Sequence, residues 1–69
     1  MSEFAVRLRH LREKRQISRL ALSELVGLSK NMIAVYERGE VEPPASVIVL
    51  LAEHFDVSTD YLLGREKNF

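Results

Sequence analysis

The chain has no cysteine, which limits both how it is stabilised and what it can bind. Without cysteine there is no disulfide and no thiolate metal site, so stability must come from packing several helices together or from dimerisation. Its 69 residues allow one domain, with a core near the lower limit for independent folding. We therefore expect a single domain over residues 1–69, with a core at about 4–64 and a frayed tail at 65–69.

Long hydrophobic runs are also missing. The apolar run at residues 47–52 is far shorter than the roughly 20 residues that a bilayer requires. No segment resembles a signal peptide. These absences predict a soluble protein of the cytoplasm, with no membrane partner.

No pattern of catalytic or metal-binding residues is present. His10 and His54 lie far apart in the sequence, and neither has a metal-ligand spacing. The serines are explained as helix caps rather than nucleophiles. We expect no enzymatic activity, no metal, no cofactor and no small-molecule ligand.

Net charge is absent too, because ten basic residues balance ten acidic ones. This balance at first argues against a nucleic-acid partner, since attraction to phosphate supplies most non-specific affinity. The charges are nevertheless separated along the chain. Residues 1–38 contain eight basic and four acidic side chains, whereas residues 39–69 contain two basic and six acidic ones. The first half therefore carries a net charge of +4 and could face nucleic acid.

Apolar spacing predicts five helices and no strands, because no segment alternates with period two. Ser18, Ser29 and Ser58 are the expected N-caps of the second, third and fifth helices. Two prolines after Gly39 prevent the third helix from continuing. The expected helices cover about residues 3–15, 18–26, 29–38, 46–55 and 58–64.

The second and third predicted helices form a pair separated by Gly27. A left-handed backbone conformation suits glycine at such a sharp change of direction and is costly for most residues. Each member of the pair has an apolar face to bury, so both can share one small core. The apolar residues concerned are Leu22, Val26, Leu28, Ile33 and Tyr36.

The order and spacing of several residues extend this pattern over most of the chain. They are small Ser23, Gly27, Ser29, Ile33, the run YERG at 36–39, Pro43 and the run DYLLG at 60–64. On these motifs residues 8–64 resemble the phage-repressor and Xre-like (Cro/C1-type) family of helix-turn-helix domains. The resemblance implies a compact five-helix, lambda-repressor-like fold and a bacterial or phage-encoded regulator of transcription. Its function would be sequence-specific binding of double-stranded DNA, most simply as a repressor.

In a helix-turn-helix the second helix of the pair presents its N-terminal part to base edges in the major groove. The Asn31 amide can pair with adenine, and Lys30 can donate to guanine or to a phosphate. Ala34 and Val35 can contact a thymine methyl group, although Val35 could equally belong to the core. The predicted base-reading residues are Lys30, Asn31, Met32, Ala34, Val35 and Arg38.

Two further residues are expected to contact phosphate. Arg19 stands where the family usually has a glutamine that reaches the DNA backbone, and Ser29 lies at the start of the third helix. By the same resemblance, Arg12 pairs with Glu37 inside the domain. The loop after the third helix departs from the family, because it has Glu40 and Glu42 where basic residues are common. We therefore expect no minor-groove contact from this loop.

A single recognition helix reads only a few base pairs, which favours a homodimer at least on DNA. Surplus apolar residues or the tail through Phe69 are candidate contacts. An alternative function is a protein-interaction module, such as an antitoxin or antirepressor, with weak DNA binding. The surplus apolar residues are Leu20, Leu25, Val47 and Leu50.

Overall fold

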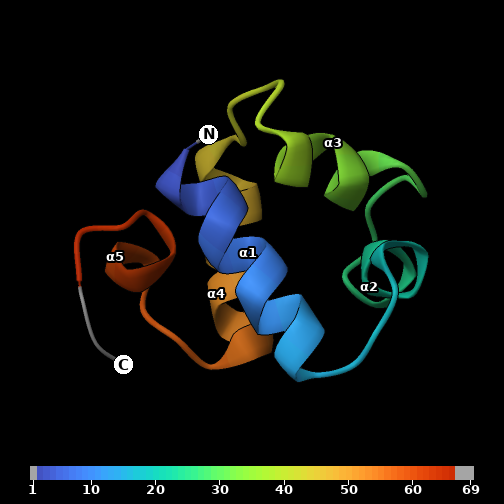
Figure 1. The fold of residues 1–69 in the computed structure, drawn as a ribbon, viewed down its shortest axis with the longest axis horizontal. Helices are drawn as coiled ribbons and strands as arrows, with labels where there is room; N and C mark the ends of the chain where they lie inside the picture. The colour runs from blue at the N-terminus through green and yellow to red at the C-terminus, as the bar shows by residue number, and fades with distance from the viewer. Residues whose placement is uncertain (1, 67–69) are drawn as a thin grey trace.

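The computed structural model describes residues 2–66, and within that part of the chain all regular structure is helical. The predicted all-α, five-helix architecture is confirmed (Figure 1). Residues 67–69 of the expected tail, including Phe69, lie outside the described residues. The helices are α1 (Glu3–Lys14), α2 (Arg19–Leu25), α3 (Met32–Arg38), α4 (Ala45–Phe55) and α5 (Thr59–Leu62).

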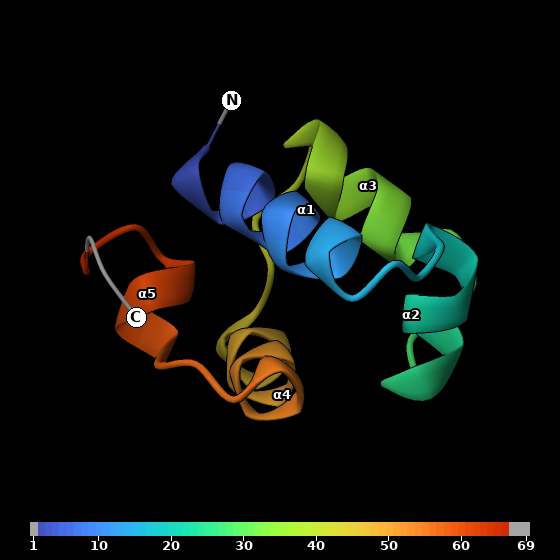
Figure 2. The same ribbon diagram turned by 60° about the horizontal axis from the view of Figure 1, so that its bottom comes forward.

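α1 lies at the centre of the molecule, with α5 on one side and the α2–α3 pair on the other (Figures 1 and 2). Its predicted apolar stripe is confirmed, since Phe4, Leu8 and Leu11 are all buried. Burying one such face on each helix supplies the main driving force for folding. The core also contains Leu22, Ile33, Tyr36, Val47, Leu51, Ala52, Phe55, Tyr61 and Leu62.

Gly27 ends α2 as predicted. Its backbone is left-handed, with φ of 76°. The Gly27 N–H donates to the Glu24 carbonyl at 3.2 Å, and the Leu28 N–H donates to the Ser23 carbonyl at 2.9 Å. This pair of bonds satisfies the last carbonyls of α2 while the chain turns toward α3.

Serine hydroxyls cap two of the three helices for which we expected them. Ser18 accepts from the Ala21 N–H and Ser58 from the Tyr61 N–H, at 3.0 and 2.9 Å. The predicted Ser29 cap is wrong, because α3 begins only at Met32. The Ser29 carbonyl accepts the Met32 N–H at 3.0 Å, which closes a turn through residues 29–32 with backbone groups alone. This turn moves the helix start beyond the reach of the hydroxyl.

The interpretation of Val47 as a surplus surface residue is also wrong. α4 starts at Ala45, and Val47 then shares one helix face with Leu51 and Phe55, so only 8% of it is exposed. By contrast Leu20 and Leu25 on α2 are 49% and 64% exposed, as their sequence context suggested. No helix among residues 2–66 has the length and apolar character needed to cross a bilayer.

Candidate nucleic-acid interface

The position of α3 is determined by its contact with α2. Leu22 and Ile33 are completely buried where the two helices meet. Ser23 is buried as well, and its hydroxyl oxygen accepts the Ile33 N–H at 3.3 Å. This bond satisfies an N–H group in the first turn of α3 that has no partner within the helix. These contacts fix which face of α3 packs against the core, and the opposite face is left toward solvent.

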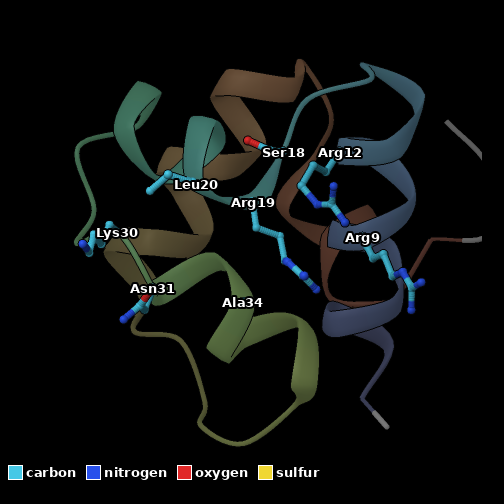
Figure 3. A pocket seen from close by; sticks show the side chains of 8 residues that line it. All are labelled: Arg9, Arg12, Ser18, Arg19, Leu20, Lys30, Asn31 and Ala34. Carbon is cyan, nitrogen blue, oxygen red and sulfur yellow. The ribbon is translucent and has the colours of Figure 1, made fainter.

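A surface hollow of about 650 Å³ lies between α1, the start of α2 and the start of α3 (Figure 3). Four of the predicted DNA-contacting residues line it, although they come from separate segments of the chain. Arg19 is on α2, Lys30 and Asn31 are in the turn, and Ala34 is on α3. The remaining lining residues are Arg9, Arg12, Ser18 and Leu20.

The hollow is lined by basic side chains and by no acidic one. Arg19 and Lys30 are exposed, and neither forms an ion pair within residues 2–66. In Figure 3 Arg19 extends between α1 and α3, while Lys30 and Asn31 lie toward the opposite side of the hollow from Arg9. Four of the eight basic residues in the first half of the sequence therefore lie around one surface that also presents an amide.

Arg12 is the one basic lining residue that is held in a buried ion pair. Its Nε and Nη2 donate to the two Glu37 carboxylate oxygens at 2.6 and 3.1 Å, and its Nη1 donates to the Ile17 carbonyl at 2.8 Å. The hydrogen bonds that Arg12 donates to Glu37 raise the pKa of Arg12 above the ordinary arginine value, against the opposing effect of desolvation. The expected Arg12–Glu37 pair is confirmed, and it joins α1 to α3.

Arg9 is a member of the hollow that sequence reasoning missed. It pairs with Glu13 one turn along α1 at 3.1 Å, and 60% of its side chain remains exposed. The signal was present in its spacing. Because Arg9 precedes Arg12 by three residues, the two lie on the same face of a helix.

The other predicted contact residues lie outside the hollow. Ser29 is exposed, Val35 is half-buried, and Met32 is half-buried against the core. Arg38, at the end of α3, pairs with Glu40. The structure thus brings together Arg19, Lys30, Asn31 and Ala34, and it does not place Ser29, Met32, Val35 and Arg38 in the same hollow.

The two histidines do not form a common site. His10 is exposed on α1, whereas His54 is half-buried on α4 and makes an edge-to-face contact with Phe55. Across residues 2–66 there is no group of three or more His, Asp or Glu side chains placed to hold a metal ion.

α2 and α3 are two short helices in contact at Ser23, and a basic hollow lies beside α3. This arrangement defines a helix-turn-helix protein. A family model described as helix-turn-helix matches residues 8–62. The chain belongs to this helix-turn-helix family, and within it to the phage-repressor and Xre-like type that its motifs resemble.

Three known proteins illustrate the relationship. The HTH-type transcriptional regulator AnsR of Bacillus subtilis is 41% identical over 61 residues, which are 88% of this chain and 53% of AnsR. The uncharacterised HTH-type transcriptional regulator YobD of the same organism is 38% identical over 61 residues, covering 88% of this chain and 54% of YobD. The chain spans about half the length of these Bacillus relatives.

The third is a solved structure, the P22 c2 repressor protein in complex with synthetic operator 9T in the presence of Tl+. It aligns with 91% of this chain and 96% of its own length, with a TM-score of 0.83 and 35% sequence identity. The repressor is that of a Salmonella phage.

Proposed function

We propose that this chain binds double-stranded DNA in a sequence-specific manner and regulates transcription, most simply as a repressor that blocks access of polymerase. The observation that supports this most directly is the basic hollow, which Arg19 and Lys30, neither of them ion-paired within residues 2–66, share with the Asn31 amide at the start of α3. The likeness to a repressor bound to its operator supports the same function. A bacterial or phage-infected cytoplasm is the compartment that fits it.

In this proposal residues 29–38 read the major groove. Asn31 pairs with an adenine, and Lys30 donates to guanine or phosphate. Arg19 and Ser29 contact the DNA backbone, which positions the helix without carrying sequence information. Ala34 offers a methyl group to thymine, with Met32, Val35 and Arg38 completing the proposed contact set.

The proposed regulator acts as a homodimer at least on DNA. A short recognition helix contacts few base pairs, whereas a two-fold dimer reads two half-sites about one helical turn apart. Of the surplus apolar residues, Val47 is buried and Leu20 lines the hollow, which leaves half-buried Leu50 and exposed Leu25. These two residues, or the tail through Phe69, are the candidates for such a contact. Sedimentation of the free protein and of its complex with a site selected from random duplexes measures the stoichiometry. One protomer on a site without two-fold symmetry would exclude the dimer.

The salt dependence of binding to random duplex DNA tests the DNA-binding function. We expect log affinity to fall linearly with log salt, with a slope of about −0.9 for each phosphate neutralised. Arg19→Ala should weaken binding to every duplex similarly and reduce the slope by about 0.9. Arg65→Ala is the matched control, because Arg65 is an exposed arginine after α5, outside the hollow.

Two results would contradict the proposal. Absence of salt-dependent binding would favour the protein-interaction module over the DNA-binding regulator. An unchanged slope in folded Arg19→Ala, or an equal loss in Arg65→Ala, would show that the hollow does not face phosphate.

A further inference from the structure

The C-terminal end of α3 carries an ion pair that spans the end of the helix. Arg38 Nε lies 3.0 Å from Glu40 Oε2, and Arg38 Nη2 lies 3.3 Å from Glu40 Oε1. Residues two positions apart on a helix do not face each other. Gly39 makes the contact possible, because its left-handed backbone (φ 73°, ψ 22°) turns the chain so that Glu40 approaches Arg38.

This pair contributes little to the stability of the fold. Both side chains are 55% exposed, and exposed ion pairs are typically worth about 0–1 kcal/mol. The Arg12–Glu37 pair differs, since its side chains are only 12% and 4% exposed. Folding therefore gives no strong reason for a carboxylate at position 40.

The geometry has a direct consequence for a phosphate ligand. Two parallel N–H···O bonds are also the arrangement in which a guanidinium binds phosphate oxygens. Glu40 occupies that donor edge of Arg38 with both of its oxygens. Arg38 is the only basic residue in α3, so the pair leaves the helix with no uncompensated positive side chain at its C-terminal end.

We propose that Glu40 limits the affinity of this protein for DNA by holding Arg38 in an ion pair that neutralises its charge and competes with a DNA phosphate. The proposal rests on the DNA-binding function proposed above and names a residue that adjusts it. In the wild-type protein Arg38 adds little to non-specific affinity, because the Glu40 carboxylate already neutralises it and repels a nearby phosphate. Contact with random DNA then depends on Lys30, at the other end of the reading segment, and on Arg19 of α2, so the protein leaves random sites more readily.

Glu40→Gln tests the proposal, with Glu42→Gln as a matched control. Glu42 is exposed in the same loop, and within residues 2–66 it forms no ion pair. Each variant removes one negative charge, but only Glu40→Gln frees Arg38. Binding to a random duplex of about 20 base pairs is measured by fluorescence anisotropy from about 50 to 200 mM salt.

We expect Glu40→Gln to bind random DNA more tightly at low salt and to steepen the slope by about 0.9, the value for one additional phosphate contact. Over a fourfold rise in salt, that slope makes the loss of affinity about 3.5-fold larger than in the wild type. Glu42→Gln should leave the slope close to the wild-type value. Adding Arg38→Gln to Glu40→Gln should remove the gain, because the freed guanidinium is then absent.

Three results would overturn the proposed role of Glu40, and they differ in what they leave standing. Equal slope changes in Glu40→Gln and Glu42→Gln would overturn the proposal in favour of general charge repulsion. Unchanged binding in Glu40→Gln, with salt-dependent binding by the wild type, would overturn this proposal and leave the DNA-binding function intact. No binding by the wild type would overturn both. Circular dichroism melting checks that each variant is folded, and Glu40→Ala provides a second variant without the carboxylate.

Discussion

Replacing Glu37 by alanine should destabilise this domain more than any change at a surface ion pair. Glu37 is one of the two buried polar residues in the described chain, and it binds Arg12 through both carboxylate oxygens. Without it, the Arg12 guanidinium, which is only 12% exposed in the wild type, keeps its bond to the Ile17 carbonyl and a longer contact of 4.0 Å with the exposed Glu13 carboxylate. A buried charge deprived of its partner costs about 3–5 kcal/mol.

That cost is large relative to the stability of a chain of 69 residues. At about 0.05–0.15 kcal/mol per residue, the wild-type free energy of unfolding is roughly 3–10 kcal/mol. Glu37→Ala should therefore remove from about a third to all of the free energy of unfolding. Since 1 kcal/mol shifts Tm by roughly 4–8 °C in a domain of this size, we expect Tm to fall by at least about 12 °C.

Urea unfolding followed by circular dichroism measures the loss, with Glu13→Ala as the control. Glu13 is 54% exposed and pairs with exposed Arg9 at 3.1 Å, a kind of i, i+4 pair worth about 0.3–0.5 kcal/mol. It also lies 4.0 Å from Arg12, so Glu13→Ala measures what Arg12 loses when an exposed partner is removed. The double variant Arg12→Met with Glu37→Leu should regain much of the loss, because it leaves no buried charge unpaired. A cost below about 1 kcal/mol for Glu37→Ala, close to that of Glu13→Ala, would refute the argument that desolvation controls this pair.

Three further predictions concern base reading and backbone conformation. Asn31→Ala should cost about 1–3 kcal/mol at one base position and leave affinity for random DNA nearly unchanged in duplex competition assays; uniform weakening would make Asn31 a backbone contact only. Gln16→Gly should raise the free energy of unfolding by about 0.5–1 kcal/mol in urea, because Gln16 is exposed with φ of 57°; a loss of stability would show that its side chain matters. Gly64→Ala should cost more than Gly27→Ala in thermal melts, since a Cβ at Gly64 would clash with the Glu3 Cβ whereas Gly27 has open space; equal costs would mean that backbone strain alone matters.

The parts of the fold that sequence predicted well depend on neighbouring residues. Ser18 and Ser58 cap helices because a hydroxyl reaches an N–H three residues ahead, and Gly27 ends α2 because it adopts a left-handed backbone. The Arg12–Glu37 pair spans 25 residues and was predicted only through resemblance to a family. Local spacing offers no means of pairing residues so far apart.

The two errors have different causes. Ser29 was a reasonable cap by type, but a turn of backbone hydrogen bonds delays α3 to Met32, and the start of a helix is uncertain by one or two residues from sequence. Val47 was counted among the surplus apolar residues, yet it precedes buried Leu51 and Phe55 by four and eight residues and shares their helix face. Which face of α4 is buried depends on how that helix packs in the fold.

The sequence by itself determined that this chain is all-helical, where α2 ends, and that its positive charge lies in the first half, because periodicity, turn residues and composition are local properties. Only the tertiary structure brought Arg9, Arg19 and Lys30 of three separate segments around one hollow, since that arrangement depends on how α1 packs against α3 and α2. The tertiary structure also decided which basic side chains are held in ion pairs and which are left exposed without one. Arg12 and Arg38 are basic in the sequence, but Glu37 in the core and Glu40 beyond Gly39 hold them in ion pairs, because folding brings those carboxylates within hydrogen-bonding distance.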